Sequence, residues 1–147
     1  MLGYRNRARV HYTQGARRWS GITDGRNSAR GQFPAYADCS AFTTWALWNG
    51  LYLLYREPDQ VNGLGWNYGF TGTQIAHGRR VAPSKMTHGD LVFYASSGQT
   101  PTHVAICVGR KQGRPMVVSH GSESGPLYLP WNYRRHVQVR RHIHSDV

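Results

Sequence analysis

The chain contains 147 residues, and its 18 lysines and arginines against 7 aspartates and glutamates give a formal net charge of +11. This length fits one domain spanning residues 1–147, large enough to bury a hydrophobic core without disulfides. Aromatic residues make up 12% of the chain, which argues against a disordered protein, and scattered glycines and prolines exclude a coiled coil. No apolar run is long enough for a transmembrane helix, and the basic N-terminus lacks the apolar stretch of a cleaved signal peptide.

The basic residues are almost all of one kind, because 16 of the 18 are arginine. The planar guanidinium group favours two-point contacts with phosphates and carboxylates. A domain this basic therefore predicts a polyanionic partner, which can be a nucleic acid, an anionic membrane or an anionic cell-wall polymer. Charge alone does not choose among the three.

The first third of the chain combines an irregular segment with one clear helix. Glycines and a proline interrupt any periodicity in residues 1–37, where we expect only a short turn around 17–19. Residues 39–49 carry apolar side chains at helical spacing. Asp38 stands where an N-cap belongs and Gly50 where a terminating glycine belongs, so the helix has a start and a stop signal.

The middle of the chain is predicted to pass from a loop through a short helix to a strand. Residues 56–70 contain the Pro, Asp, Asn and Gly residues typical of a long loop. A short helix at about 72–78 is expected to end at Gly78. Residues 91–94 (Leu-Val-Phe-Tyr) follow a turn signal and predict a strand.

The C-terminal part is predicted to be a sheet. Residues 103–108 and 116–120 are β-prone runs separated by a turn at 109–115, which predicts an antiparallel hairpin. Residues 137–143 alternate in polarity and are expected to form a last, edge strand. A helix followed by consecutive strands indicates an α+β fold, in which the N-terminal helix that carries Cys39 packs on an antiparallel β-sheet.

Cys39 is the first candidate for chemistry because it lies in the first turn of the predicted helix. The partial positive charge and free N–H groups of a helix N-terminus favour a thiolate over a thiol, which would make Cys39 a good nucleophile. The other cysteine, Cys107, is expected to be a buried residue of its strand.

Two histidines lie where they could serve such a nucleophile. His103 begins one predicted strand and His120 ends the next, so antiparallel pairing can put them side by side on the face covered by the helix. Cys39, His103 and His120 would then be nucleophile, base and orienting residue. The order of cysteine, histidine and polar residue is that of papain-like proteases.

Other interpretations of these residues stay open at this point. A buried cysteine is often only a small core residue, and a disulfide between Cys39 and Cys107 is possible by count. The histidines at positions 136, 142 and 144 are the best metal-binding group, but the sequence shows no evident fourth ligand. We therefore predict neither a metal nor another cofactor.

Three short blocks, taken together, resemble a known family. Asp38-Cys39-Ser40, residues 89–94 (Gly-Asp-Leu-Val-Phe-Tyr) and residues 103–109 (His-Val-Ala-Ile-Cys-Val-Gly) occur in that order. They resemble the D-C-S, G-D-L-V-F-F and H-V-G-I-Y-x-G blocks of the NlpC/P60 cysteine peptidases. Residues 11–15, 63–69 and 118–123 are similar to the N-terminal peptidase module of actinobacteriophage endolysins, so the resemblance extends from Tyr12 to about Gly125.

The resemblance implies a papain-like α+β fold and hydrolysis of amide bonds in peptidoglycan stem peptides. The expected bond joins D-iso-glutamate, or iso-glutamine, to diaminopimelate. By this resemblance, Cys39 is the nucleophile, His103 the general base and His120 the polar residue that orients the imidazole.

The resemblance also assigns residues around the nucleophile. Tyr12 would help the backbone N–H of Cys39 to hold the oxyanion, and Asp38 and Ser40 would contact the substrate, often at a free amine. An N-cap is an equal alternative for Asp38. The chain departs from the family pattern at Ala41 and Ala16, where glycines are usual, and in a longer stretch between Tyr12 and Cys39 and a wide gap between the two histidines.

Several functions remain to be separated. The resemblance favours a phage endolysin domain that is made in the host cytoplasm without a signal peptide and acts on the bacterial cell wall, with the arginine-rich surface holding anionic wall polymers. An N-acetylmuramoyl-L-alanine amidase of the CHAP type is the alternative within the same class. A non-catalytic wall-binding domain and a basic nucleic-acid binder are the alternatives outside it, and no nucleic-acid motif supports the last.

Overall fold

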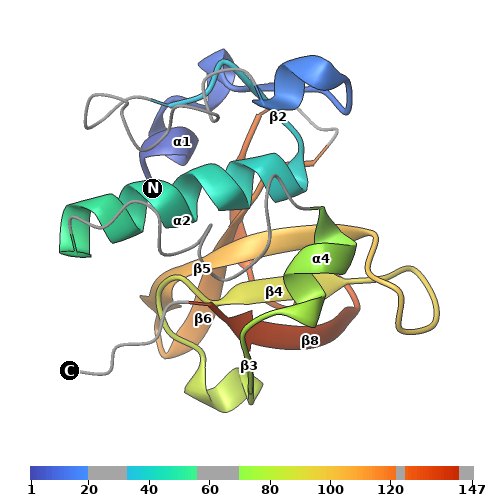
Figure 1. Cartoon of the computed structure of the whole chain (residues 1–147). Coiled ribbons are helices and arrows are strands. Elements are labelled where there is room, and N and C mark those ends of the chain that lie inside the picture. The colour runs from blue at the N-terminus through green and yellow to red at the C-terminus, as the bar shows by residue number, and fades with distance from the viewer. Residues whose placement is uncertain (20–32, 56–69, 122–124, 143–147) are drawn as a thin grey trace.

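The computed structural model describes residues 1–19, 33–55, 70–121 and 125–142 (Figure 1). Its α-helices are α1 (Leu2–Arg5), α2 (Cys39–Tyr55) and α4 (Thr71–Ala76), and its 3-10 helices are η1 (Arg7–Arg9), η2 (Ala16–Trp19) and η3 (Pro83–Lys85). Its strands are β1 (His11–Tyr12), β2 (Tyr36–Ala37), β3 (Arg79–Val81), β4 (Leu91–Tyr94), β5 (His103–Lys111), β6 (Arg114–Ser119), β7 (Leu127–Pro130) and β8 (His136–Arg141).

Six of these strands form one sheet in the order β3-β8-β4-β5-β6-β7, and every neighbouring pair in it is antiparallel. Helix α2 lies over one face of this sheet (Figure 1). The short strands β1 and β2 pair in parallel and form a separate two-stranded ribbon. The predicted α+β class, with the cysteine-bearing helix packed on an antiparallel sheet, is confirmed.

Strand β4 shows why the sheet has a core on each face. All four of its residues are buried, and successive side chains point to opposite faces. Leu91 and Phe93 belong to the core beneath α2, whereas Val92 and Tyr94 belong to a second core on the far face. A strand that is buried on both faces has a continuous run of apolar residues in its sequence. This run is the reason that β4 could be predicted.

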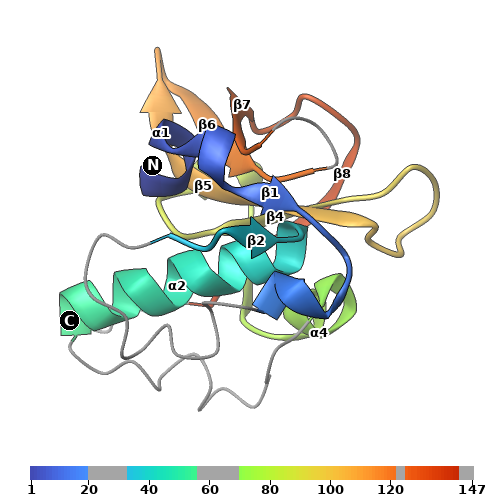
Figure 2. The same ribbon diagram turned by 90° about the horizontal axis from the view of Figure 1, so that it is seen from above.

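The N-terminal segment closes the core beneath α2. Val10 is buried in the same cluster as Phe42 and Trp45 of the helix. The ring of Tyr4 lies 5.8 Å from that of Tyr128 on β7. Viewed from above, this segment runs alongside the first half of α2 (Figure 2). It therefore packs against both the helix and the β7 edge of the sheet.

The start of α2 is set by a side-chain cap. Oδ1 of Asp38 accepts hydrogen bonds from the backbone N–H of Ala41 at 2.8 Å and from the hydroxyl of Ser40 at 3.0 Å. Its other oxygen, Oδ2, lies 3.3 Å from Nε of Arg18. An aspartate that accepts from the third helical residue is an N-cap, so the capping role is confirmed.

A second set of polar contacts joins α4 to the first turns of α2. The side chain of Gln74 is fully buried, and its Nε2 donates to the backbone oxygen of Ser40 and contacts the hydroxyls of Thr43 and Thr44 at 3.1–3.2 Å. The backbone oxygen of Gln74 lies 2.9 Å from Nε2 of His142. The first turn of α2 is thus tied to α4, and α4 to the C-terminal end of β8.

The predicted elements are found with shifted boundaries. The helix expected at 39–49 continues to Tyr55, the short helix lies at 71–76, and the strand at 91–94 is present as predicted. The hairpin is confirmed, but its strands are longer than expected, because Lys111 pairs with Arg114 across a two-residue turn. The loop expected at 56–70 lies outside the described residues except for its last position.

Two expectations about the fold are wrong. The strand expected at the sheet edge is β8, which lies between β3 and β4, because Arg79–Val81 adds a further strand that the sequence did not indicate. The segment 1–37 is less irregular than predicted, since it contains α1, η1, β1 and β2 besides η2, where a turn around 17–19 was expected. Among the described residues, no helix is long and apolar enough to cross a membrane.

The N-cap generates a first prediction. Asp38→Ala removes the cap and should lower the free energy of unfolding by about 1–2 kcal/mol, whereas Asp38→Asn keeps a capping oxygen and should cost less than half as much. Urea unfolding at neutral pH measures both. Equal losses in the two variants would instead assign the stabilisation to the ion pair with Arg18. Partly exposed ion pairs seldom contribute that much stability, so we expect the losses to differ.

Candidate active site

Cys39 is the first residue of α2, and its side chain is 9% exposed. Burial raises the pKa of its thiol to about 11; hydrogen bonds from the backbone at Val104 and Ser40 lower it only partly, and the charge of Asp38 raises it again. The prediction of a thiolate stabilised by the helix N-terminus is therefore wrong for the resting protein. Loss of water around the sulfur outweighs the helix N–H groups, and Cys39 is a thiol at neutral pH.

The hydrogen bond from Val104 also shows where the Cys39 sulfur lies. Val104 is the second residue of β5 and follows His103 directly. The thiol at the start of α2 therefore lies beside the first residues of β5, which places the two elements that carry Cys39 and His103 against each other.

His103 is also buried, with 7% of its surface exposed. Its Nε2 lies 2.7 Å from the hydroxyl of Ser119, and that hydroxyl lies 2.9 Å from the hydroxyl of Tyr133. Burial, together with smaller electrostatic contributions from Arg134 and His120, lowers the pKa of His103 to about 4. The imidazole is therefore neutral at pH 7 and able to accept a proton.

His120 follows β6 directly and is 1% exposed. Its ring lies 5.6 Å from that of Tyr12 in an edge-on arrangement and 5.4 Å from that of Phe42. Its Nε2 is 3.4 Å from the backbone oxygen of His11. The structure thus brings Tyr12 and His120 together, and the hydroxyl of Tyr12 accepts a hydrogen bond from Gln14 at 3.0 Å.

The expectation that both histidines lie on the helix-covered face of the hairpin is wrong for His103. Ala105 pairs with Ser119, so His103, two residues before Ala105, shares its face with Ser119 and not with His120. The ring of His103 lies 5.8 Å from that of Tyr94, which belongs to the core away from α2.

A β-bulge explains why His103 and His120 lie on opposite faces of the hairpin. The register of the hairpin shifts between Cys107 and Gly109, so β5 contains one residue more than β6 over this stretch. Counted from the pair Lys111 and Arg114 without a bulge, Ala105 would stand opposite His120. The extra residue moves the pairing by one position, which exchanges the side chains of the two faces.

The substrate-binding residues predicted next to the nucleophile take part in the cap. The hydroxyl of Ser40 donates to Asp38, and Ser40 is 2% exposed. Tyr12 pairs with Ala37 in the β1–β2 ribbon, immediately before Asp38 in the chain. The structure therefore brings Tyr12, Asp38 and Ser40 to the same end of α2 as Cys39.

Sequence reasoning missed three residues around His103, namely Ser119, Tyr133 and Arg134. Ser119 stands directly before His120, but only the register of the hairpin shows that it faces His103. Tyr133 and Arg134 lie between β7 and β8, and no motif marks them. Arg134 is exposed, and its guanidinium lies 5.9 Å from the ring centre of Tyr94.

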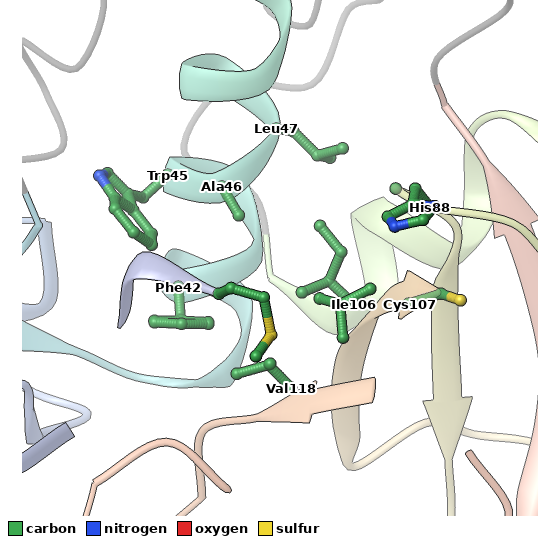
Figure 3. A pocket seen from close by; sticks show the side chains of 11 residues that line it. Phe42, Trp45, Ala46, Leu47, His88, Ile106, Cys107 and Val118 are labelled. Atoms are coloured by element: carbon green, nitrogen blue, oxygen red, sulfur yellow. The ribbon is translucent and has the colours of Figure 1, made fainter. Parts of the chain in front are cut away.

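An apolar cavity of about 300 Å³ lies elsewhere on α2 (Figure 3). Phe42, Trp45 and Leu47 line it from the helix, and Ile106 and Val118 line it from the hairpin. None of Cys39, His103 and His120 lines this cavity, so it is separate from the candidate site.

The two cysteines are not joined. Both Cys39 and Cys107 are free and buried, which excludes the disulfide alternative and confirms Cys107 as a core residue of β5. Within the described ranges, no group of three or more His, Cys, Asp or Glu side chains has an arrangement suited to a metal ion.

Comparison with known protein families gives a match to the model of the NlpC/P60 family over residues 18–140. The matched range contains Cys39, His103 and His120, whereas Tyr12 lies before it. Since the match covers most of the chain, the protein belongs to the NlpC/P60 family, a family of peptidoglycan hydrolases and cysteine peptidases that act at the cell wall.

Proposed function

We propose that this protein is a cysteine endopeptidase with a papain-like arrangement of its site, and that it cleaves peptidoglycan stem peptides between D-iso-glutamate, or iso-glutamine, and diaminopimelate. The observation that carries the proposal is the position of Cys39. A capped helix start holds its sulfur against the backbone of Val104, directly after a buried, neutral His103. A thiol and a neutral base on adjoining elements are the parts that thiol-based acyl transfer requires.

The protonation states define the first step of the proposed mechanism. Cys39 holds its proton and His103 is neutral at pH 7, so the imidazole takes the proton as the sulfur attacks the stem-peptide carbonyl. The tetrahedral intermediate collapses to a thioester, and the imidazolium gives the proton to the departing amine. Water, deprotonated by His103, then releases the acid product and restores the thiol. The pair thus works by general-base catalysis rather than from a preformed ion pair.

The remaining site residues have proposed roles at the same end of α2. The backbone N–H of Cys39 and the hydroxyl of Tyr12 are the proposed oxyanion donors. Oδ1 of Asp38 takes part in the cap and accepts a hydrogen bond from Ser40, whereas Oδ2 is paired with Arg18. Oδ2 is the oxygen proposed to bind a free amine of the substrate. His120 completes the set as a buried imidazole whose electrostatic interaction with His103 helps to lower the pKa of His103.

We also propose that the protein works as the catalytic part of a phage endolysin. The resemblance of residues 11–15, 63–69 and 118–123 to endolysin peptidase modules supports this role. In such a role, synthesis would occur in the host cytoplasm and action would follow release to the wall.

Digestion of purified diaminopimelate-type peptidoglycan tests the proposed activity. Wild type should release fragments with a new diaminopimelate amine, and Cys39→Ala should lower the rate by several orders of magnitude, because the members of a catalytic set act as a unit. Mass spectrometry identifies the new terminus. Cys107→Ala, at the other buried free cysteine, is the matched control and should retain activity.

Three results would contradict parts of this proposal. Equal digestion by wild type and Cys39→Ala would exclude the cysteine mechanism. A new L-alanine amine would make the protein an amidase of the CHAP type. No release by either protein from several wall types would leave a non-catalytic wall-binding domain as the better account.

The lowered pKa of His103 predicts the acid limb of the pH profile. Only the neutral imidazole accepts the thiol proton, so kcat/KM should fall as pH drops through about 4, far below the usual histidine value of 6.5. Initial rates on a purified muropeptide between pH 3 and 8, with circular dichroism to confirm that the fold persists, measure this limb. An acid limb near pH 6.5 in the folded enzyme would show that His103 is solvated like an ordinary histidine.

The charge distribution supports a second part of the proposal, the binding of anionic wall polymers. In the described part of the chain the acidic side chains are Asp38 and Asp90, and each forms an ion pair with an arginine, Arg18 and Arg141 respectively. The other described basic residues have no carboxylate partner there. Exposed Arg79 and Arg80 on β3 are examples. We propose that this surplus of positive charge holds the enzyme on the wall.

Binding to walls should therefore depend strongly on salt. Cys39→Ala, which leaves the wall intact, should lose at least about tenfold in affinity between 0.05 and 0.5 M NaCl, because salt screens exposed charges over a few ångströms. Sedimentation with purified walls measures the bound fraction. Arg79→Gln combined with Arg80→Gln should weaken binding at low salt, and binding that is unchanged by salt would exclude electrostatic anchoring.

A further inference from the structure

The imidazole of His103 ends a chain of three polar side chains. Its Nε2 lies 2.7 Å from Oγ of Ser119, which lies 2.9 Å from the hydroxyl of Tyr133. Ser119 is 4% exposed and sits in the last position of β6, paired with Ala105. The strand pairing therefore holds the hydroxyl in place, and little water reaches it.

The direction of the hydrogen bonds in this chain decides whether His103 can act as a base. A neutral imidazole carries one N–H. If Nε2 carries it, Nε2 donates to Ser119, Ser119 donates to Tyr133, and the lone pair of Nδ1 is free. If Ser119 donates to Nε2 instead, the proton sits on Nδ1, and no ring nitrogen remains to accept the proton of a thiol.

We propose that Ser119, supported by Tyr133, is a positioning residue that holds His103 in the Nε2–H tautomer and so leaves Nδ1 to accept the proton of Cys39. The role of Nδ1 rests on the proposed peptidase function. The tautomer itself does not, because it is a property of the free protein. Ser119 thereby takes the place on the ring that the resemblance to the family assigned to His120.

Geometry distinguishes the two candidates for this position. Ser119 shares the face of His103 and lies within hydrogen-bond distance of Nε2. His120 stands on the opposite face, where its ring packs on Phe42 and Tyr12. Because of the bulge in β5, Ser119 rather than His120 lies on the face of His103. The orienting group is therefore a neutral hydroxyl, which holds the ring without adding a charge beside it.

Nuclear magnetic resonance of the histidine ring nitrogens in the absence of substrate tests the tautomer directly. In uniformly 15N-labelled wild type at pH 7, the His103 signals, assigned by their loss in His103→Gln, should show the Nε2–H form. Ser119→Ala should populate the Nδ1–H form, and Ser119→Thr, which restores a hydroxyl on a strand position, should return the wild-type pattern. Tyr133→Phe should have a smaller effect, because Ser119 still accepts from Nε2.

Kinetics on a purified muropeptide provide the second measurement. Ser119→Ala should lower kcat about 10- to 100-fold, as losses of orienting partners do, with KM changed less than about twofold. Ser119→Thr should recover most of the rate. Ser84→Ala, an exposed serine on η3, is the matched control and should behave as wild type. Urea unfolding of each variant identifies any loss that comes from a damaged fold.

The role of Ser119 and the proposed peptidase function are overturned by different outcomes. An Nδ1–H tautomer in wild type, or an unchanged tautomer and kcat in Ser119→Ala, would exclude Ser119 as the positioning residue. A tautomer that shifts in His120→Gln but not in Ser119→Ala would assign the role to His120. A wild type that cleaves no wall would refute the proposed function alone, while the tautomer in wild type would still decide the role of Ser119.

Discussion

The carboxylate of Asp38 is the contact on which the rest of the candidate site depends. By accepting the N–H of Ala41 it makes Cys39 the first residue of α2, and that start places the sulfur against the backbone of β5. The first turn is then held from a second side, where Gln74 donates to the backbone oxygen of Ser40. A helix that began one residue later would rotate the thiol by about 100° away from Val104 and its strand.

Burial decides the chemical character of the pair. A cysteine at a helix N-terminus and a histidine nearby suggest a thiolate and an imidazolium, yet the structure keeps both groups from water. Desolvation penalises the charged form of each, which raises the pKa of the thiol to about 11 and lowers that of the imidazole to about 4. In the mechanism proposed above, this neutral pair keeps the proton on sulfur until substrate binds, and the orientation of the imidazole ring controls whether the proton can move.

Much of this arrangement could be predicted from the sequence, wherever the signal is local. The cap at Asp38, the helix after it, the buried strand Leu91–Tyr94 and the hairpin from His103 are each encoded within a few residues, and all are present. The three blocks around Cys39, Gly89 and His103 identified the family that the comparison confirms. Among the elements that were missed, the strand Arg79–Val81 has only three residues, and its pairing partner β8 is distant in the chain.

The sequence by itself determined the family, the cap at Asp38, the helix after it and the buried strands, because helix caps, buried strands and tight turns depend on neighbours in the chain. Only the tertiary structure decided which side chain faces His103. Side chains alternate between the two faces of a strand, so a single extra residue between Cys107 and Gly109 was enough to bring Ser119 to the imidazole and send His120 to the other face. Gly109, whose φ is +118°, is a local signal for a bulge, but the register that the bulge produces depends on how β6 pairs with β5 in the sheet.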